Sequence, residues 1–315
     1  MQRLILAGEA MGLLIAQSEG PLSTVRGYDL AVAGAEYNVA VGVARLGHDV
    51  SYMTKLGRDP FGERICAGLK ENGIGQELLS WSERRRTGFM LKSRVTKGDP
   101  HIFYYRAGSA ASTLAAADVG KISFAEYTHL HVTGILPALG DGPREATEVM
   151  MDAARRAGLH ISFDPNLRPQ LWESKEKMVK VLNRLASKAD LVLPSVAEGK
   201  ILVGSDDPKE IHAFYRKQGA KRCITKCGSA GAFWSDGVHE GMEKGVTVRK
   251  VVDTVGAGDG FAAGVLTALM EGLPLPKAVQ RGNLIGALQV MHRGDNEGLP
   301  ARAQLRAFME QEGIV

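Results

Sequence analysis

The chain has 315 residues, a net charge of +4 and three cysteines. That length provides one large domain or two smaller ones with a sizeable core, so no disulfide or metal is needed to hold the fold. The charge is spread along the chain, and the one dense basic cluster, RRR at 84–86, is expected to be a solvated loop rather than a phosphate or nucleic-acid contact. The sparse, odd set of cysteines indicates a reducing compartment.

The N-terminal segment MQRLILAGEAMGLLIA superficially resembles a signal peptide. Glu9 interrupts its apolar run and no small-residue cleavage site follows cleanly, so we expect a buried first strand that ends near Gly8. No apolar stretch approaches the roughly 20 residues that a membrane span needs. We therefore expect a cytoplasmic protein of enzyme size that enters no membrane and binds no nucleic acid.

Short apolar runs alternate with amphipathic segments along most of the chain. The expected strands are 4–8, 50–57, 129–134, 160–166, 189–195 and 221–228. The expected helices are 35–47, 61–73, 142–158 and 174–189. Several of these helical segments end on glycine, as helices commonly do. The alternation predicts an α/β fold with a mostly parallel sheet covered on both faces, and ligands in such folds bind at the carboxyl ends of the strands.

Two segments interrupt the alternation. Residues 12–34 and 87–110 have hairpin-like β patterning, and the second is arranged around the turn signal KGDP at 97–100. We expect the two segments to form a small separate sheet laid over the strand ends. The chain shows no internal repeat and no low-complexity linker.

Two pairs of residues invite interpretation as metal ligands. Cys223 and Cys227 lack a partner Cys or His pair at a suitable spacing, so burial in or near a strand is the simpler interpretation. His129 and His131 have the period-two spacing of one face of an apolar strand. We expect no metal site at either pair.

The segment VVDTVGAGDGFAAG, residues 251–264, packs four glycines around one acid, Asp259. It contains G-x-G-x-x-A, a weak match to the dinucleotide fingerprint. The match lies late in the chain rather than after the first strand, and Asp259 would face the pyrophosphate. No P-loop sequence occurs, so a nucleotide triphosphate would need another kind of site.

A phosphoryl-transfer interpretation removes this conflict. Gly256, Ala257 and Gly258 can donate backbone N–H groups to a transferring phosphoryl group, while Asp259 accepts the proton of the incoming hydroxyl. Spacing alone also allows a glycine-rich helix start in which Asp259 is an ordinary first-turn acid.

The same segment resembles the C-terminal signature of the ribokinase-like (PfkB) sugar kinases. The N-terminal signature of that family is matched by AGAEYNVAVGVARLG at 33–47 followed by KLGRDPFG at 55–62, and ITKCGSAG at 224–231 is similar to its nucleotide loop. The resemblance covers essentially the whole chain. It implies one αβα-sandwich domain over 1–315 with a β-sheet lid from about 12–34 and 87–110, whose closure would exclude water from the phosphoryl group.

The resemblance also implies roles for individual residues. Asp259 would be the catalytic base, with Gly256, Ala257 and Gly258 forming the anion hole. ATP and Mg²⁺ would be bound with the help of Ser195, Thr225, Lys226, Gly228, Ser229, Gly231, Gly256, Gly258 and Asn283. Glu198 would act on Mg²⁺ indirectly, and Ser195 stands where the family often has Asn. Asp253 resembles part of a monovalent-cation loop for K⁺, and capping of the loop by Asp253 is an equal alternative.

Within the family the chain most resembles 2-keto-3-deoxygluconate kinases, through FYYRAGSAAS (103–112), FDPNLRPQLW (163–172) and GDNEGLP (294–300). This implies ATP-dependent phosphorylation of the terminal (C6) hydroxyl of that sugar acid. The substrate would be bound by Gly34, Asn38, Phe89, Tyr104, Arg106, Ile135, Arg168 and Asp295. Arg106 and Arg168 would hold the carboxylate with planar donor forks. Gly34 would approach the sugar closely because it has no Cβ, and Phe89 stands where a lid tyrosine is expected.

Three alternatives stay open at the level of sequence. A fructokinase- or ribokinase-like enzyme for a neutral sugar is the first, since Arg168 can be structural and Arg106 can be a lid-surface residue. A catalytically silent binding protein is the second, although it would have no reason to keep Asp259. A dinucleotide oxidoreductase is the third. We also expect a homodimer or higher oligomer, because exposed lid sheets can pair edge to edge.

Overall fold

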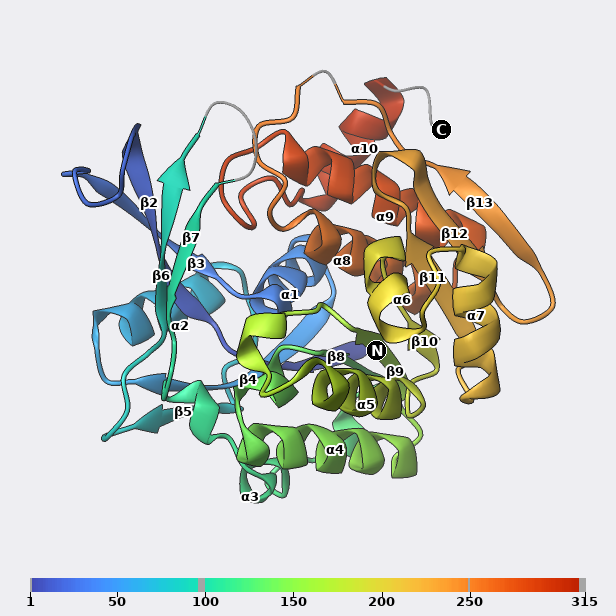
Figure 1. Cartoon of the computed structure of the whole chain (residues 1–315), viewed down its shortest axis with the longest axis horizontal. Helices are drawn as coiled ribbons and strands as arrows, with labels where there is room; N and C mark the ends of the chain where they lie inside the picture. The colour runs from blue at the N-terminus through green and yellow to red at the C-terminus, as the bar shows by residue number, and fades with distance from the viewer. Residues whose placement is uncertain (1, 96–99, 249, 312–315) are drawn as a thin grey trace.

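The computed structural model describes residues 2–95, 100–248 and 250–311. Across these residues a nine-stranded sheet forms the centre of the molecule (Figure 1). In order across the sheet its strands are β13 (Glu240–Lys244), β12 (Gly231–Ser235), β11 (Arg222–Lys226), β10 (Leu191–Val192), β9 (His160–Asp164), β8 (His129–Thr133), β1 (Arg3–Ala7), β4 (Asp49–Gly57) and β5 (Leu79–Ser82). Strands β5 through β11 of this order pair in parallel, and β12 and β13 are antiparallel.

The central strands are buried on both faces because helices cover the sheet on each side. Leu4 and Leu6 of β1 pack into one core and the intervening Ile5 packs into the other, as the alternation of side chains along a strand requires. One face is covered by α1 (Ala35–Arg45), α2 (Pro60–Glu71), α8 (Ala257–Met270), α9 (Leu275–Val290) and α10 (Arg302–Gln311). The other face is covered by α3 (Ala116–Val119), α4 (Asp141–Arg156), α5 (Lys175–Ala186), α6 (Val196–Leu202) and α7 (Pro208–Lys217).

Helix boundaries follow local capping chemistry. Asp59 caps α2 by accepting a hydrogen bond from the Gly62 backbone N–H at 2.9 Å, and Pro60 occupies the first helical position, where its missing N–H costs nothing. Ser174 caps α5 in the same way through the Lys177 N–H at 3.1 Å. These caps place the helix starts within a residue or two of the predicted segments.

The small second sheet contains β3 (Tyr28–Ala33), β2 (Met11–Glu19), β6 (Phe89–Arg94) and β7 (Ile102–Tyr105), in that order. Its strands β2, β6 and β7 project from one side of the molecule in Figure 1. The α/β class, the mostly parallel central sheet and the small extra sheet were therefore predicted correctly. The KGDP turn signal lies largely outside the described residues, which resume at 100, and closure of the small sheet as a lid stays a prediction.

One predicted strand is much shorter than expected. The segment 189–195 forms only β10, and Ser195 already caps α6. Extended pairing continues for two residues, because the Leu193 N–H donates to Phe163 O and Pro194 O accepts from the Lys226 N–H. Pro194 has no N–H of its own, which interrupts the ladder, and only an isolated bridge between Ser195 and Lys226 follows. None of the described helices has the length and apolar character of a membrane span.

Candidate active site

A cavity of about 860 Å³ lies at the carboxyl ends of the parallel strands, beneath the small sheet. Its walls include Met90 and Tyr104 from the small sheet, Asp164 from the end of β9 and Gly258 and Asp259 from the start of α8. This is the edge of the sheet where the alternating pattern predicted a ligand site.

A second, more apolar cavity of about 380 Å³ adjoins the first. It is lined by glycines of the β11–β12 turn, by Val246 and by Phe261 and Ala287 from α8 and α9. Lys226, Gly228, Thr254 and Gly258 line both cavities. The two cavities therefore meet at the N-terminus of α8.

Asp259 lies in the first turn of α8 and lines only the larger of the two cavities. Its Oδ2 accepts a hydrogen bond of 2.7 Å from Nδ2 of Asn38, on α1. Burial raises the pKa of Asp259 to about 7, although the Asn38 hydrogen bond and the charge of Arg168 act in the opposite direction. A carboxyl group with that pKa is suited to exchange a proton near neutral pH. Asn38, predicted as a substrate ligand, thus also orients the acid.

Gly256 precedes α8 in a conformation that only glycine adopts easily. Its φ is +80°, and a Cβ at this position would lie 2.0 Å from the carbonyl oxygen of Asp295. The close contact joins the loop before α8 to the loop after α9. The backbone N–H groups of the first turn of α8 have no acceptor within the helix, as at any helix N-terminus. Ala257 N has one long contact, 3.4 Å from Thr254 O.

A buried ion pair lies where the two cavities meet. Nζ of Lys226 is 2.5 Å from Oδ2 of Asp164, and a Cβ on Gly258 would lie 3.9 Å from the same Nζ. Burial raises the pKa of Asp164 to about 6, against the lowering effect of the Lys226 charge. Lys226 was predicted as a nucleotide residue, whereas Asp164 was missed. Asp164 lies at the carboxyl end of a parallel strand, in the sequence DPN, and that position could have indicated a site residue.

Arg106 does not lie on the surface of the lid, so its interpretation as a lid-surface residue was wrong. It is 7% exposed and lines the larger cavity, but its Nε donates to Glu9 Oε2 at 2.6 Å and its guanidinium forms an ion pair with the same carboxylate. Ser109 also donates to Glu9. Glu9 was interpreted only as an interruption of an apolar run, so sequence reasoning missed the group that neutralises Arg106.

Arg168, Tyr104 and Ile135, which were predicted to bind the substrate, all line the larger cavity. Nη1 of Arg168 donates to its neighbour's carbonyl, Leu167 O, at 2.8 Å. Among the residues that the structure describes, no carboxylate lies within ion-pair distance of Arg168. Asn166 also lines the cavity and was missed; its φ of +41° is rare for a residue with a side chain and marks a strained turn.

Phe89 and Gly34, both predicted to bind the substrate, each have a role in the packing of the chain. Phe89 is stacked between Phe61 and Tyr105, with ring centroids 5.1 and 4.7 Å away, and is not part of the cavity wall. Gly34 does line the cavity, but a Cβ there would lie 2.6 Å from Glu9 O, and its φ is +145°. The backbone of the segment between β1 and β2 is therefore enough to require glycine at this position.

The predicted nucleotide residues divide into three groups, and two of these residues, Ser195 and Gly256, line only the larger cavity. Lys226, Gly228, Ser229, Gly231, Gly258 and Asn283 line the apolar cavity. Thr225 does not: its hydroxyl lies 3.0 Å from His212 Nε2 on the opposite face of β11, because neighbouring side chains of a strand point in opposite directions. The predicted contact of Thr225 with the nucleotide is therefore not evident in the structure.

Ser195 and Glu198 form a capping box at the start of α6. Ser195 N donates to Glu198 Oε2 at 2.7 Å, and Glu198 N donates to Ser195 Oγ at 3.2 Å. Glu198 Oε1 accepts from Leu167 N at 2.9 Å. Both residues line the larger cavity, and Ser195 has a structural reason to be a small hydroxyl residue.

Asp253 and Asp295 share a partner that the sequence did not reveal. Nζ of Lys92, on β6, lies 2.6 Å from Asp253 Oδ2 and 2.9 Å from Asp295 Oδ1. Asp295 lines the larger cavity, yet its carboxylate is engaged in this ion pair. Its predicted contact with the sugar is therefore not evident in the structure.

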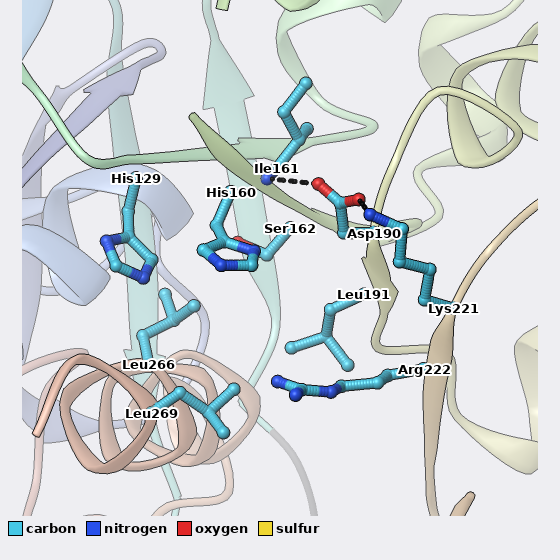
Figure 2. Close-up of a pocket in the computed structure, with 10 residues that line it drawn as sticks. All are labelled: His129, His160, Ile161, Ser162, Asp190, Leu191, Lys221, Arg222, Leu266 and Leu269. Atoms are coloured by element: carbon cyan, nitrogen blue, oxygen red, sulfur yellow. Dashed lines mark hydrogen bonds and ion pairs between the residues drawn. The ribbon is translucent and has the colours of Figure 1, made fainter. Parts of the chain in front are cut away.

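A further pocket, of about 110 Å³, lies at the opposite edge of the sheet (Figure 2). It is lined by the first residues of several strands, including His129, His160 and Arg222, and Asp190 closes one side by accepting from Ile161 N and pairing with Lys221. None of the predicted catalytic, nucleotide or sugar residues lies in it.

The histidines and cysteines have the structural roles expected of them. His129 and His131 are buried in β8, and His131 Nδ1 lies 2.8 Å from Ser162 Oγ. Cys223 is buried in β11, and Cys227 follows that strand. No group of three or more His, Cys, Asp or Glu among the described residues could hold a metal ion. The RRR cluster at 84–86 is exposed, as predicted.

Comparisons with known proteins agree with this geometry. The family described as pfkB family carbohydrate kinase matches residues 1–302. A 2-dehydro-3-deoxygluconokinase of Bacillus subtilis (strain 168) is 45% identical over 309 residues, which cover 98% of this chain and 95% of that protein.

Two solved structures are similar over nearly the whole chain. A PfkB protein from Polaromonas sp. JS666 has a TM-score of 0.90 and 42% identity, covering 98% of this chain and 100% of its own. A double-mutant fructokinase from Vibrio cholerae O395, in fructose, ADP and potassium ion bound form, has a TM-score of 0.85 and 26% identity, covering 98% of each chain.

Proposed function

The chain belongs to the pfkB family of carbohydrate kinases, and from this premise we propose that it phosphorylates 2-dehydro-3-deoxygluconate, also called 2-keto-3-deoxygluconate. The γ-phosphoryl group of ATP would pass to the terminal (C6) hydroxyl of this sugar acid. The observation that carries the proposal is the place of Asp259, which faces the larger cavity where that cavity meets the apolar one. The name of the Bacillus subtilis relative supports the choice of sugar.

Asp259 is the base in this proposal. The sugar hydroxyl donates a hydrogen bond to the carboxylate and gives up its proton as the new O–P bond forms and the P–O bond to ADP breaks. The hydrogen bond from Asn38 keeps the carboxylate in one orientation. Because the carboxylate must be ionised to accept the proton, turnover should fall as the pH falls below the pKa of Asp259, about 7.

The phosphoryl group is proposed to lie at the N-terminus of α8. Gly256, Ala257 and Gly258 have no side chain larger than a methyl group, so the backbone N–H groups of the first helical turn can be reached by phosphate oxygens. Lys226 lines both cavities, so its ammonium can neutralise charge on the nucleotide as it crosses from one cavity to the other.

The apolar cavity is the proposed nucleotide site. Its volume of about 380 Å³ and its lining of Val246, Phe261 and Ala287 suit a purine ring and a ribose. Backbone groups of Gly228 and Gly231 can approach the nucleotide because neither residue has a Cβ. The Vibrio cholerae fructokinase, whose structure contains ADP, supports a nucleotide in this family.

Magnesium is proposed to arrive with ATP as part of the substrate. Glu198 lines the larger cavity near Lys226, and both of its oxygens already accept backbone hydrogen bonds, from Leu167 and Ser195. Each oxygen keeps a second lone pair, so Glu198 can still accept a hydrogen bond from a water molecule bound to the metal. This is the indirect role expected from the sequence.

Arg168 is the proposed partner of the substrate carboxylate. It lines the cavity, and no carboxylate of the described residues pairs with it, so its planar donor fork is available to an acid. Arg106 contributes less charge because Glu9 pairs with it. Tyr104, 37% exposed on β7, can contribute a hydroxyl from above.

One observation favours the second candidate, a kinase of a neutral sugar such as fructose. With Arg106 paired to Glu9, the larger cavity has one arginine fewer to offer a carboxylate than the sequence suggested. A buried Arg–Glu pair can bind sugar hydroxyls instead of an acid.

A coupled assay of ADP release against 2-dehydro-3-deoxygluconate, fructose and ribose tests the proposal. The keto-deoxy acid should have the highest kcat/KM. Arg168→Leu should raise KM for the acid by about 100-fold, since a charge-assisted pair is lost, with KM for ATP unchanged. Arg216→Leu, which removes an exposed arginine of α7, is the matched control and should change neither KM. A clear preference for fructose or ribose would rule out the sugar acid.

A homodimer joined through the small sheet is also proposed. Leu30, Phe103 and Tyr105 are exposed on its outer strands β3 and β7, at 47, 55 and 54%. Light scattering on the purified protein should give twice the monomer mass, and Phe103→Lys should lower it to the monomer value. A monomeric parent protein would refute this assignment.

A further inference from the structure

Lys92 is an almost completely buried lysine. It lies on β6 of the small sheet, and 2% of its side chain is exposed. Its ammonium lies between Asp253 Oδ2 at 2.6 Å and Asp295 Oδ1 at 2.9 Å. Burial alone would lower the pKa of Lys92, but the two carboxylates outweigh it and keep the group charged. An unpaired buried ammonium would be costly, so the two carboxylates are what allow a lysine at this position.

The two carboxylates belong to loops that frame the catalytic acid. Asp253 lies in the loop before α8, and its Oδ1 accepts from Val255 N at 3.1 Å. Asp295 lies in the loop after α9, and Asp253 Oδ2 also accepts from Gly294 N of that loop at 3.3 Å. Lys92 therefore stabilises the contact between the two loops.

The carbonyl oxygens of the same loops are also occupied by a donor of the chain. Nε2 of Gln289 donates to Gly294 O at 2.8 Å and to Val255 O at 3.3 Å, and Gln289 is fully buried. Carboxylate and carbonyl oxygens are the ligands that K⁺ prefers. In this chain, an ammonium already lies between the two carboxylates, and an amide donates to two carbonyl oxygens of the same loops.

The residues present thus do not fit the monovalent cation that the sequence suggested at Asp253. The Vibrio cholerae fructokinase has a potassium ion bound, so a cation is part of at least one relative. Here the positive charge comes from the small sheet, at a position 203 residues away from Asp295 in sequence. Capping by Asp253, the other alternative, is observed through Val255 N.

We propose that Lys92 is a built-in substitute for the monovalent cation. Its ammonium holds the loops around 253–256 and 294–298 together, and the contact of Gly256 with Asp295 O transmits that constraint to the start of α8. Lys92 is a positioning residue, since it acts on Asp259 and the anion hole through these loops. The consequence for turnover rests on the proposed kinase function, and the consequence for stability does not.

Thermal unfolding without any substrate tests the structural part. The parent protein should have the same midpoint in potassium chloride and in tetramethylammonium chloride, whose cation is too large for the site. Lys92→Ala should unfold at a lower temperature in tetramethylammonium, and K⁺ or methylammonium should raise its midpoint in a saturable way. Lys55→Ala is the matched control, because Lys55 also pairs with one carboxylate, Asp118, at 3.0 Å, but away from these loops.

Turnover tests the functional part. The parent kcat should be unchanged between the two salts. Lys92→Ala should lose about 100-fold in kcat in tetramethylammonium, as expected for a displaced anion hole, and regain about tenfold or more with K⁺ or methylammonium. KM for the sugar should change little. Lys92→Arg keeps a cation at the site, so it should remain independent of K⁺ even if Lys92→Ala does not fold.

Either of two results would overturn the inference. Activation or stabilisation of the parent protein by K⁺ would mean that the loops bind an added cation despite Lys92. Failure of K⁺ and methylammonium to stabilise a folded Lys92→Ala would mean that the ammonium has no cation-like role. A parent protein that does not phosphorylate the sugar acid would refute the proposed substrate alone, because the unfolding experiment contains no substrate.

Discussion

Removing the amide of Asn38 should shift the pH dependence of turnover. Asn38 Nδ2 donates to Asp259 Oδ2 at 2.7 Å, and this bond lowers the pKa of Asp259, which burial raises to about 7. The hydrogen bond from Asn38 stabilises the ionised carboxylate of Asp259 more than the protonated form. Asn38→Ala removes this bond and so destabilises mainly the ionised form. The pKa of Asp259 should therefore rise.

The size of the shift follows from the hydrogen bond. A bond to a charged group contributes about 1.5 kcal/mol or more, which is about one pKa unit. With a pKa about one unit higher, the ionised fraction of Asp259 at pH 7 falls from about one half to about one tenth. Turnover follows this fraction if only the ionised carboxylate can accept the proton. Turnover at pH 7 should drop about fivefold, and turnover about two pH units higher should be close to that of the parent.

The assay is kcat as a function of pH for the parent and for Asn38→Ala, with ATP and sugar both saturating. Asn72→Ala is the matched control, since Asn72 is a partly buried asparagine that bonds Arg45 Nε and Gly68 O away from the cavity. An acidic limb that stays in place, or moves to lower pH, in Asn38→Ala would refute the role given to Asn38. An acidic limb that persists unchanged in Asp259→Asn would refute the role given to Asp259.

Three further changes have distinct expected outcomes. Gly256→Ala should lower kcat severely and destabilise the fold by about 1–3 kcal/mol, measured by urea unfolding. The φ of Gly256 is +80°, and the added Cβ would collide with Asp295 O. Parent-like activity would show that the turn can relax. Thr225→Val should leave the KM for ATP unchanged and lower the free energy of unfolding by about 1 kcal/mol, because the hydroxyl contacts His212 and not the nucleotide cavity. A raised KM for ATP would show that Thr225 does contact the nucleotide. Phe89→Leu should leave the KM for the sugar near the parent value, because the ring stacks outside the cavity; a large increase in that KM would place it in the substrate site.

Much of the fold could be predicted because its determinants are local. The apolar run of β1 and the amphipathic, glycine-ended segment that forms α2 each have a direct physical meaning within a few residues. The family was identified correctly from two separated signatures, since residues 1–302 match it. The shortening of β10 was missed because Pro194 was treated as part of the strand.

The site was harder to predict because its charges are paired over long distances in sequence. Glu9 and Arg106 are 97 residues apart, and Lys92 and Asp295 are 203 residues apart, so no spacing rule connects them. Charge alone suggested that Arg106 was free for a carboxylate. Only the arrangement in space shows that Glu9 already neutralises Arg106, whereas no carboxylate in the described part of the chain pairs with Arg168 at the cavity.

The position of the transferred phosphate on the sugar decides whether the proposed reaction is correct. The product formed from ATP and 2-dehydro-3-deoxygluconate can be examined by phosphorus and carbon NMR, with the parent protein and with Asp259→Asn at matched ATP occupancy. We expect a phosphate monoester on C6 with the parent and almost no product with Asp259→Asn. A phosphate on another carbon, or parent-level turnover by Asp259→Asn, would contradict the proposed reaction.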